Sequence, residues 1–157
     1  MALTGAGDAG YNHESRKRHQ KPPECARMSF FSPEKANALI PVLSPLIDEL
    51  WRLRRELAIK LLEQDPALRK AAGRTAGAST AERRGETRRC TELKADVVRM
   101  INRIEAYGCV MKGLDLGLLD FPALRDGQPV FLCWKAGEQT VTHWHGTDET
   151  FVDRKPL

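Results

Sequence analysis

The chain has 157 residues, of which 41% are hydrophobic, so it is long enough to fold as one globular domain with a real core. Its formal net charge is +4, and the basic excess is concentrated in residues 1–28 and 64–94. No apolar run approaches the roughly 18 residues of a membrane span, which excludes an integral membrane protein of the helical kind. The four cysteines form no Cys-x-x-Cys pair, which favours reduced thiols in a cytoplasmic protein over a disulfide framework or a zinc ribbon.

The N-terminal segment differs in composition from the rest. Residues 1–27 are basic, contain prolines and have few aliphatic side chains, so they predict a disordered tail without the apolar core of a signal peptide. Met28 opens the well-patterned part of the chain, and an alternative is that translation starts there. Residues 28–157 are expected to form a single domain.

A first long helix is predicted after residue 32. Ser32 offers a hydroxyl that can cap free amides, Pro33 suits the first helical position, and Glu34 complements the helix dipole. Leucines then recur at alternating steps of four and three, which is the heptad pattern of a coiled coil. These positions are Leu39, Leu43, Leu46, Leu50, Leu53 and Leu57.

The same spacing predicts a second helix from about Thr80 to Tyr107, ended by Gly108. Between the two helices, residues 64–80 are rich in alanine, glycine and arginine and predict a mobile connection. Two long helices joined in this way are expected to form an antiparallel hairpin.

Beyond Gly108 the apolar pattern changes from helical to extended. Turn signals at Asp126-Gly127 and at Gly137 separate three short apolar runs, which predict three antiparallel strands in a meander. The runs cover residues 118–124, 130–134 and 140–145.

Two features predict how these strands are placed. Pro122 has no N–H to donate, so the first strand is expected at the edge of the sheet. The middle run lacks polar alternation and should be covered on both faces, by the helical hairpin and by a second subunit. The predicted fold is therefore α+β: a long antiparallel helical hairpin packed on a small three-stranded antiparallel β-meander, in a homodimer.

Several motifs occur together in a specific order. They are residues 31–41, residues 112–122, Cys133-Trp134, Gly137-Glu138, Trp144-His145 and residues 154–157. In this order they resemble a bacterial family of small proteins known as domain of unknown function 2203, over about residues 29–157. The resemblance implies no reaction, cofactor or partner. One position departs from the family pattern, because His143 stands where a tyrosine or another large residue is expected.

Three residues of the sheet region are candidates for catalysis: Asp120, Glu138 and His145. Asp120 lies between Leu119 and Phe121, so it must find a polar partner if the strand is covered. Two carboxylates and an imidazole are the groups that general acid–base chemistry uses. The alternative is that His145 is structural and bonds inward to Asp120 or to the backbone.

Four further residues are candidates for ligand binding: Asp115, Arg125, Trp134 and Trp144. The tryptophans are expected on adjacent strands, where they could stack a flat ligand or simply fill the core. Asp115 could instead be a turn residue whose oxygens accept backbone hydrogen bonds.

No metal site is predicted, but His143 and His145 would be the ligands if a metal did bind. Side chains two apart share one face of a strand, and metal sites use this spacing. Further ligands could come from Cys133, Glu138, Asp115 or Asp148. Cys133 could also pair with His145 as a thiolate, or be inert in an apolar strand.

These observations leave three functions open. The first is a binding or scaffolding module that dimerises through its helices and presents a small polar-aromatic pocket to a small-molecule ligand. The second is a small hydrolase that uses Asp120, Glu138 and His145, with or without a metal. The third and weakest is nucleic-acid binding through the basic residues 69–89. The sequence identifies no cofactor.

Overall fold

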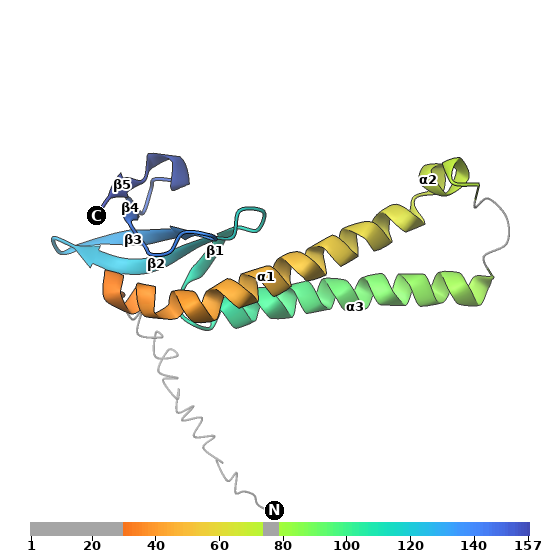
Figure 1. Ribbon diagram of the computed structural model, residues 1–157, viewed down its shortest axis with the longest axis horizontal. Helices are drawn as coiled ribbons and strands as arrows, with labels where there is room; N and C mark the ends of the chain where they lie inside the picture. Colours follow the sequence, from red (N-terminus) through yellow and green to blue (C-terminus); the bar gives the residue numbers. More distant parts are fainter. Residues whose placement is uncertain (1–29, 74–78) are drawn as a thin grey trace, which may run out of the picture.

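The computed structural model describes residues 30–73 and 79–157 of the chain. The predicted tail at residues 1–27 and the suspected start at Met28 lie outside the described residues. Two long helices lie side by side beneath one end of a small antiparallel sheet, and they extend well beyond it (Figure 1). The α+β class and the antiparallel sheet are confirmed. No helix in the described ranges has the length and apolar character needed to cross a membrane.

The helices are α1 (Pro33–Gln64), the short α2 (Pro66–Ala71) and α3 (Thr80–Glu105). Helix α1 begins where the sequence predicts, because the Ser32 side chain accepts a hydrogen bond from the Lys35 N–H. Helix α3 begins with a capping box, in which Ser79 and Glu82 each accept a backbone hydrogen bond from the other. Helix α2 lies inside the stretch 64–80, for which the sequence predicted a mobile connection.

Most leucines of the α1 heptad pack within the same chain. Leu43, Leu46, Leu50 and Leu53 are all buried, although the structure contains a single chain. Most of the apolar face that predicted a partner helix is therefore covered by α3 and by the sheet.

The sheet has five strands in the order β1-β2-β3-β4-β5, and every neighbouring pair is antiparallel. The strands are β1 (Val110–Gly113), β2 (Leu118–Arg125), β3 (Gln128–Lys135), β4 (His143–Gly146) and β5 (Lys155–Pro156), with a 3₁₀ turn η1 (Phe151–Asp153) before β5. The predicted three-stranded meander corresponds to β2–β4 and was too small. Strands β1 and β5 are too short to show an apolar alternation of their own.

The first predicted strand, β2, is not an edge strand, because β1 pairs along its outer side. This pairing ends at Asp120, however, so Pro122 lies past the end of β1. There its carbonyl accepts a hydrogen bond of 2.7 Å from the Phe31 N–H. Proline is tolerated because no strand of the described residues pairs with this side of β2 at Pro122.

The two faces of the sheet differ completely. The helix-facing face carries the apolar side chains that pack on α1, namely Leu119, Phe121, Ala123, Val130, Leu132 and Trp134. The far face carries Asp120, Cys133 and His145, which are also buried. In Figure 1, β5 and η1 lie on this far side of the sheet, away from the helices. The second cover, which the sequence predicted from another subunit, thus comes in part from the same chain.

Candidate functional site

A tight turn brings Asp120 opposite Cys133. Asp126 and Gly127 both have positive φ angles, of 52° and 76°, as the two central residues of a type I′ hairpin turn do. Such a two-residue loop fixes the register of β2 against β3, and Asp120 then pairs directly with Cys133. Side chains that are directly opposite in an antiparallel pair lie on one face, so the carboxyl and the thiol are neighbours.

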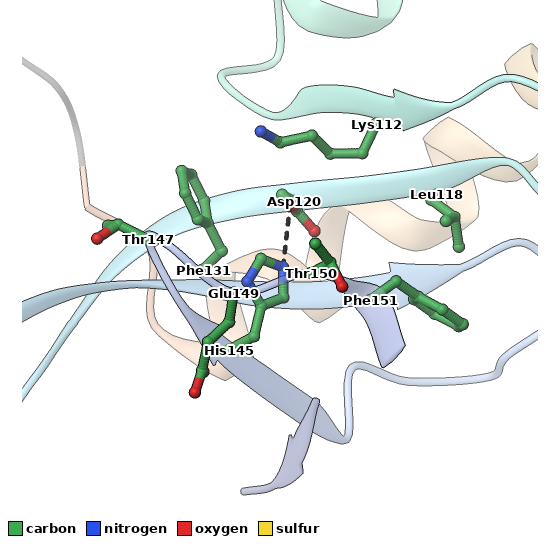
Figure 2. A pocket seen from close by; sticks show the side chains of 9 residues that line it. All are labelled: Lys112, Leu118, Asp120, Phe131, His145, Thr147, Glu149, Thr150 and Phe151. Atoms are coloured by element: carbon green, nitrogen blue, oxygen red, sulfur yellow. Dashed lines mark hydrogen bonds and ion pairs between the residues drawn. The ribbon is translucent and has the colours of Figure 1, made fainter. Parts of the chain in front are cut away.

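His145 joins them from β4, where it pairs with Phe131. Its Nε2 lies 3.1 Å from Oδ2 of Asp120, and its Nδ1 lies 2.8 Å from the carbonyl oxygen of Gly146. Figure 2 shows the imidazole and the carboxyl facing each other across the strands. The side chains of His145 and Asp120 are only 4% and 2% exposed, so this pair is shielded from solvent.

Asp120, Cys133 and His145 form one compact cluster. Each offers one donor atom, and the three donor atoms all lie within 4.8 Å of one another. The second carboxyl oxygen of Asp120, Oδ1, is buried and has no hydrogen-bond partner among the residues that the structure describes. An orphaned buried acceptor is rare in folded proteins and calls for an explanation.

The Cys133 thiol is held in its protonated form. Burial, followed by the neighbouring charge of Asp120, raises the pKa of Cys133 to about 12, and the positive charge of Arg154 opposes this shift. Without a further cation the thiol is therefore a poor nucleophile at neutral pH, since the reactive form is the thiolate.

A cavity of about 280 Å³ adjoins the cluster. It is lined by Lys112, Leu118, Asp120, Phe131, His145, Thr147, Glu149, Thr150 and Phe151. In Figure 2 the rings of Phe131 and Phe151 flank the Asp120–His145 pair. The ammonium group of Lys112 lies 5.2 Å from the centre of the Phe131 ring, and it forms no ion pair within the described residues.

Glu138 does not join Asp120 and His145. One of its carboxyl oxygens is 2.8 Å from Nη1 of Arg154, and the other accepts a hydrogen bond of 2.9 Å from the Lys135 N–H. Its carbonyl oxygen accepts a hydrogen bond of 2.8 Å from the indole of Trp134. Glu138 thus closes the turn after β3 and anchors Arg154 of the C-terminal segment.

The predicted ligand-binding residues also lie elsewhere. Asp115 is exposed and pairs with Arg54 at 2.7 Å. The sheet register places Arg125, Trp134 and Trp144 on the helix-facing side of the strands, opposite the cluster. Trp134 is fully buried there, and the Arg125 guanidinium stacks 4.7 Å from the centre of the Trp144 ring.

His143 stays outside the cluster although it pairs with Cys133 in the register. Its Nδ1 lies 2.8 Å from the Thr142 hydroxyl. The structure therefore groups His145 with Asp120 and Cys133, and not with His143. The sequence did hold a signal for this set, because the Asp126-Gly127 turn determines which residue of β3 faces Asp120.

Comparison with known proteins gives a family and no activity. No curated protein and no solved structure shows significant similarity to the chain. A family model described as "Uncharacterized conserved protein (DUF2203)" matches residues 29–157, which is most of the chain and includes every residue of the cluster. The chain therefore belongs to the DUF2203 family of uncharacterized conserved proteins.

Proposed function

We propose that the protein binds a small polar molecule in the cavity on the far face of the sheet and acts on it as a small hydrolase. The observation that carries this proposal is the buried Asp120–His145 pair at the wall of that cavity. Burying such a pair rarely gains stability over an apolar core. Ionisable groups that are buried beside a pocket are, by contrast, typical of functional sites.

The lining of the cavity supports a small, polar or anionic ligand. Its volume of about 280 Å³ is near the lower limit for small-molecule pockets. Lys112 supplies a positive charge without an acidic partner in the described residues, and Phe131 and Phe151 supply flat apolar walls. A ligand with one anionic group and a compact body would match both the positive charge of Lys112 and the apolar walls.

The pair is arranged to hold one exchangeable proton. Nδ1 of His145 faces the Gly146 carbonyl, which only accepts hydrogen bonds, so Nδ1 carries a hydrogen. The contact between Nε2 and Oδ2 then needs one more proton, shared by Asp120 and His145. Taking up and releasing that proton is the step that general acid–base hydrolysis requires.

The test is a panel of chromogenic carboxylic esters, phosphoesters and amides, together with a fragment screen by NMR. We expect turnover of one class, lost in Asp120→Asn and kept in Asp126→Asn, a matched change at an exposed turn residue. Binding at the cavity without turnover would favour the binding module over the hydrolase. The absence of both binding and turnover would contradict the proposal.

We also propose that the chain forms a homodimer through the distal end of its helices. The exposed apolar side chains Ile59, Leu62 and Leu68 surround a cavity of about 260 Å³ there, away from the sheet. The three free cysteines of the described residues support a cytoplasmic, reducing location. Sedimentation should show a dimer that Leu62→Lys converts to a monomer, whereas Val152→Lys, at an exposed valine elsewhere, should leave it intact.

Nucleic-acid binding is less well supported. Three arginines of the basic segment 69–89 already pair with acids at 3.1 Å or less. The pairs are Arg69–Glu86, Arg88–Glu92 and Arg89–Glu56. Charge that is neutralised within the protein contributes little to phosphate binding.

A further inference from the structure

We propose that Asp120, Cys133 and His145 bind one divalent transition-metal ion, by its chemistry Zn²⁺, at the wall of the far-face cavity. At this site the ion would take the place of the proton that Asp120 and His145 share in the proposed hydrolase. The metal site rests on that function only for the use made of the metal, because the metal can bind whether or not the protein has a substrate.

The hydrogen bonds of His145 leave one ring nitrogen free to bind an ion. The Gly146 carbonyl fixes the hydrogen on Nδ1, so the Nε2 of a neutral ring presents a lone pair. Nε2 lies 3.1 Å from Oδ2 of Asp120, and this oxygen is also an acceptor. Two acceptors at this distance repel each other unless a proton or a metal ion lies between them.

Asp120 and Cys133 support the metal site independently of His145. A shared proton explains the Nε2–Oδ2 contact, but it leaves Oδ1 of Asp120 buried and without a partner. It also gives the Cys133 sulfur no role beyond a weak thiol hydrogen bond to Asp120. A metal ion held by the carboxylate, the thiolate and the imidazole accounts for all three residues at once.

The spacing of the donors is close to what a tetrahedral ion needs. Bond lengths of about 2.0–2.3 Å place two ligand atoms roughly 3.3–3.6 Å apart. The Nε2–Oδ2 distance of 3.1 Å is near this value, and the donor atoms are at most 4.8 Å apart. Closing the longest separation takes about 1 Å, which side-chain rotation of a cysteine supplies without moving the strands.

Charge and ligand type select the metal. A carboxylate and a thiolate carry two negative charges, which neutralise a divalent ion and leave no net charge in a site whose ligands are at most 3% exposed. A sulfur ligand disfavours Mg²⁺ and Ca²⁺, and mixed nitrogen, oxygen and sulfur donors suit Zn²⁺. Three protein ligands leave a fourth position open, as catalytic zinc sites do.

The surroundings of His145 also match a metal ligand. Ligating histidines donate their other ring N–H to a carbonyl or carboxylate, which fixes the ring for the metal. The Gly146 carbonyl has this role, and the Gly146 N–H is itself held by the Glu149 carboxylate at 2.7 Å. Lys155 holds the other oxygen of Glu149 at 2.7 Å, so this support reaches into the C-terminal segment.

The experiment uses the full chain, stripped with a chelator and titrated with Co²⁺ alone. We expect one Co²⁺ per chain, with the visible spectrum of a tetrahedral ion and the near-ultraviolet band of a thiolate bound to cobalt. Cys133→Ser should abolish that band and weaken binding at least about 100-fold. The control Cys109→Ser, which changes a buried thiol that donates to the Ile104 carbonyl, should leave the band unchanged.

A second pair of variants tests the histidine. His145→Ala should weaken Co²⁺ binding at least about 100-fold, and His143→Ala on the same strand should not change it. The wild-type spectrum decides the question even if a variant fails to fold. Failure to bind one Co²⁺ per chain, or binding without a thiolate band, would overturn the metal site.

The hydrolase proposal and the metal site can fail independently of each other. Stoichiometric Co²⁺ binding without turnover of any substrate class contradicts the hydrolase and leaves the metal site standing. Turnover by the stripped protein, lost in Asp120→Asn but unaffected by Cys133→Ser and by added Co²⁺, keeps the hydrolase and overturns the metal site.

Discussion

The two faces of one sheet are both buried, but for different reasons. The helix-facing face is covered by a long regular helix, and its side chains are aliphatic or aromatic. The far face is covered by the irregular segment after β4, and it buries a carboxyl, a thiol and an imidazole. Adjacent residues of β2 belong to the two groups: Leu119 and Phe121 contribute to stability, and Asp120 between them contributes to the site.

This contrast teaches that burial alone does not identify a core. On the helix-facing side, each buried group replaces water by apolar contacts, which is favourable by itself. On the far side, each buried polar group must be matched by a partner, and one oxygen of Asp120 is not matched. Substitutions on the helix-facing side should therefore mainly change stability, and substitutions on the far side should mainly change the candidate site.

The largest effect is expected from Phe121→Ala on the helix-facing side. The Phe121 ring is fully buried and packs edge-on against Phe31, with ring centres 5.3 Å apart. Its removal should lower the free energy of unfolding by about 3–5 kcal/mol, measured by urea denaturation. Leu124→Ala, at a half-exposed position of the same strand, serves as the control. An equal loss in both variants would contradict this assignment of the core.

On the far side, His145→Ala in metal-free protein should cost about 2–3 kcal/mol, because it leaves the buried Asp120 carboxylate without its partner. His143→Ala, at a partly exposed histidine, should cost less than about 1 kcal/mol. Equal unfolding curves for wild type and His145→Ala would show that the pair is not structural.

A smaller effect compares two glycines with positive φ. A Cβ on Gly117 would lie 2.7 Å from the Cβ of Ala136 and 2.9 Å from Cγ2 of Ile47, on the helix-facing side. A Cβ on Gly127 would meet nothing within 4 Å. Both changes to alanine incur backbone strain of about 1–2 kcal/mol. Only Gly117→Ala should add a further loss of about 1–3 kcal/mol from overpacking, visible as a lower melting temperature.

The last comparison concerns one thiol on each side of the sheet. Burial raises the pKa of Cys109 to about 11, and burial with the charge of Asp120 raises the pKa of Cys133 to about 12. Unfolded thiols lose their protons near pH 8.5, so above this pH the unfolded chain binds fewer protons than the folded one. Stability should therefore fall as the pH rises from about 8.5 towards 11 and 12.

The two thiols can be separated by titrating thiolate absorbance in metal-free protein whose Cys25 and Cys90 are replaced by serine. Asp120→Asn should lower the pKa of Cys133, because it removes the nearby negative charge, and should leave that of Cys109 unchanged. If Asp120→Asn changed the pKa of both thiols, the effect of Asp120 would not be confined to the far face of the sheet.

The two long helices and the three central strands were predictable because each has a local signal. Ser32 caps α1, the leucines of α1 repeat in heptads, and Asp126-Gly127 marks the hairpin between β2 and β3. Strands β1 and β5 had no such signal, since each is short and is held in place by its neighbour. The pairing of such short strands depends on tertiary packing, which a single sequence does not display.

The candidate site was predictable in part for the same reason. Asp120 stood out because it is an acid between two apolar residues, and the tight turn already placed Cys133 opposite it. His145 reaches them through the long connection between β3 and β4, whose register no turn rule fixes. Glu138 was expected beside them, but its carboxylate pairs with Arg154, and nothing in the sequence showed that Arg154 returns to it.

Pro122 has a consequence for behaviour at high concentration. No strand of the described residues pairs with the outer side of β2 beyond Asp120. An open strand edge is a template on which another chain can add a strand and start aggregation. Proline offers no N–H at this place, and its carbonyl is already occupied by the Phe31 N–H at 2.7 Å. The exposed stretch therefore presents a blocked edge to neighbouring molecules, which protects a small sheet from growing into a fibre.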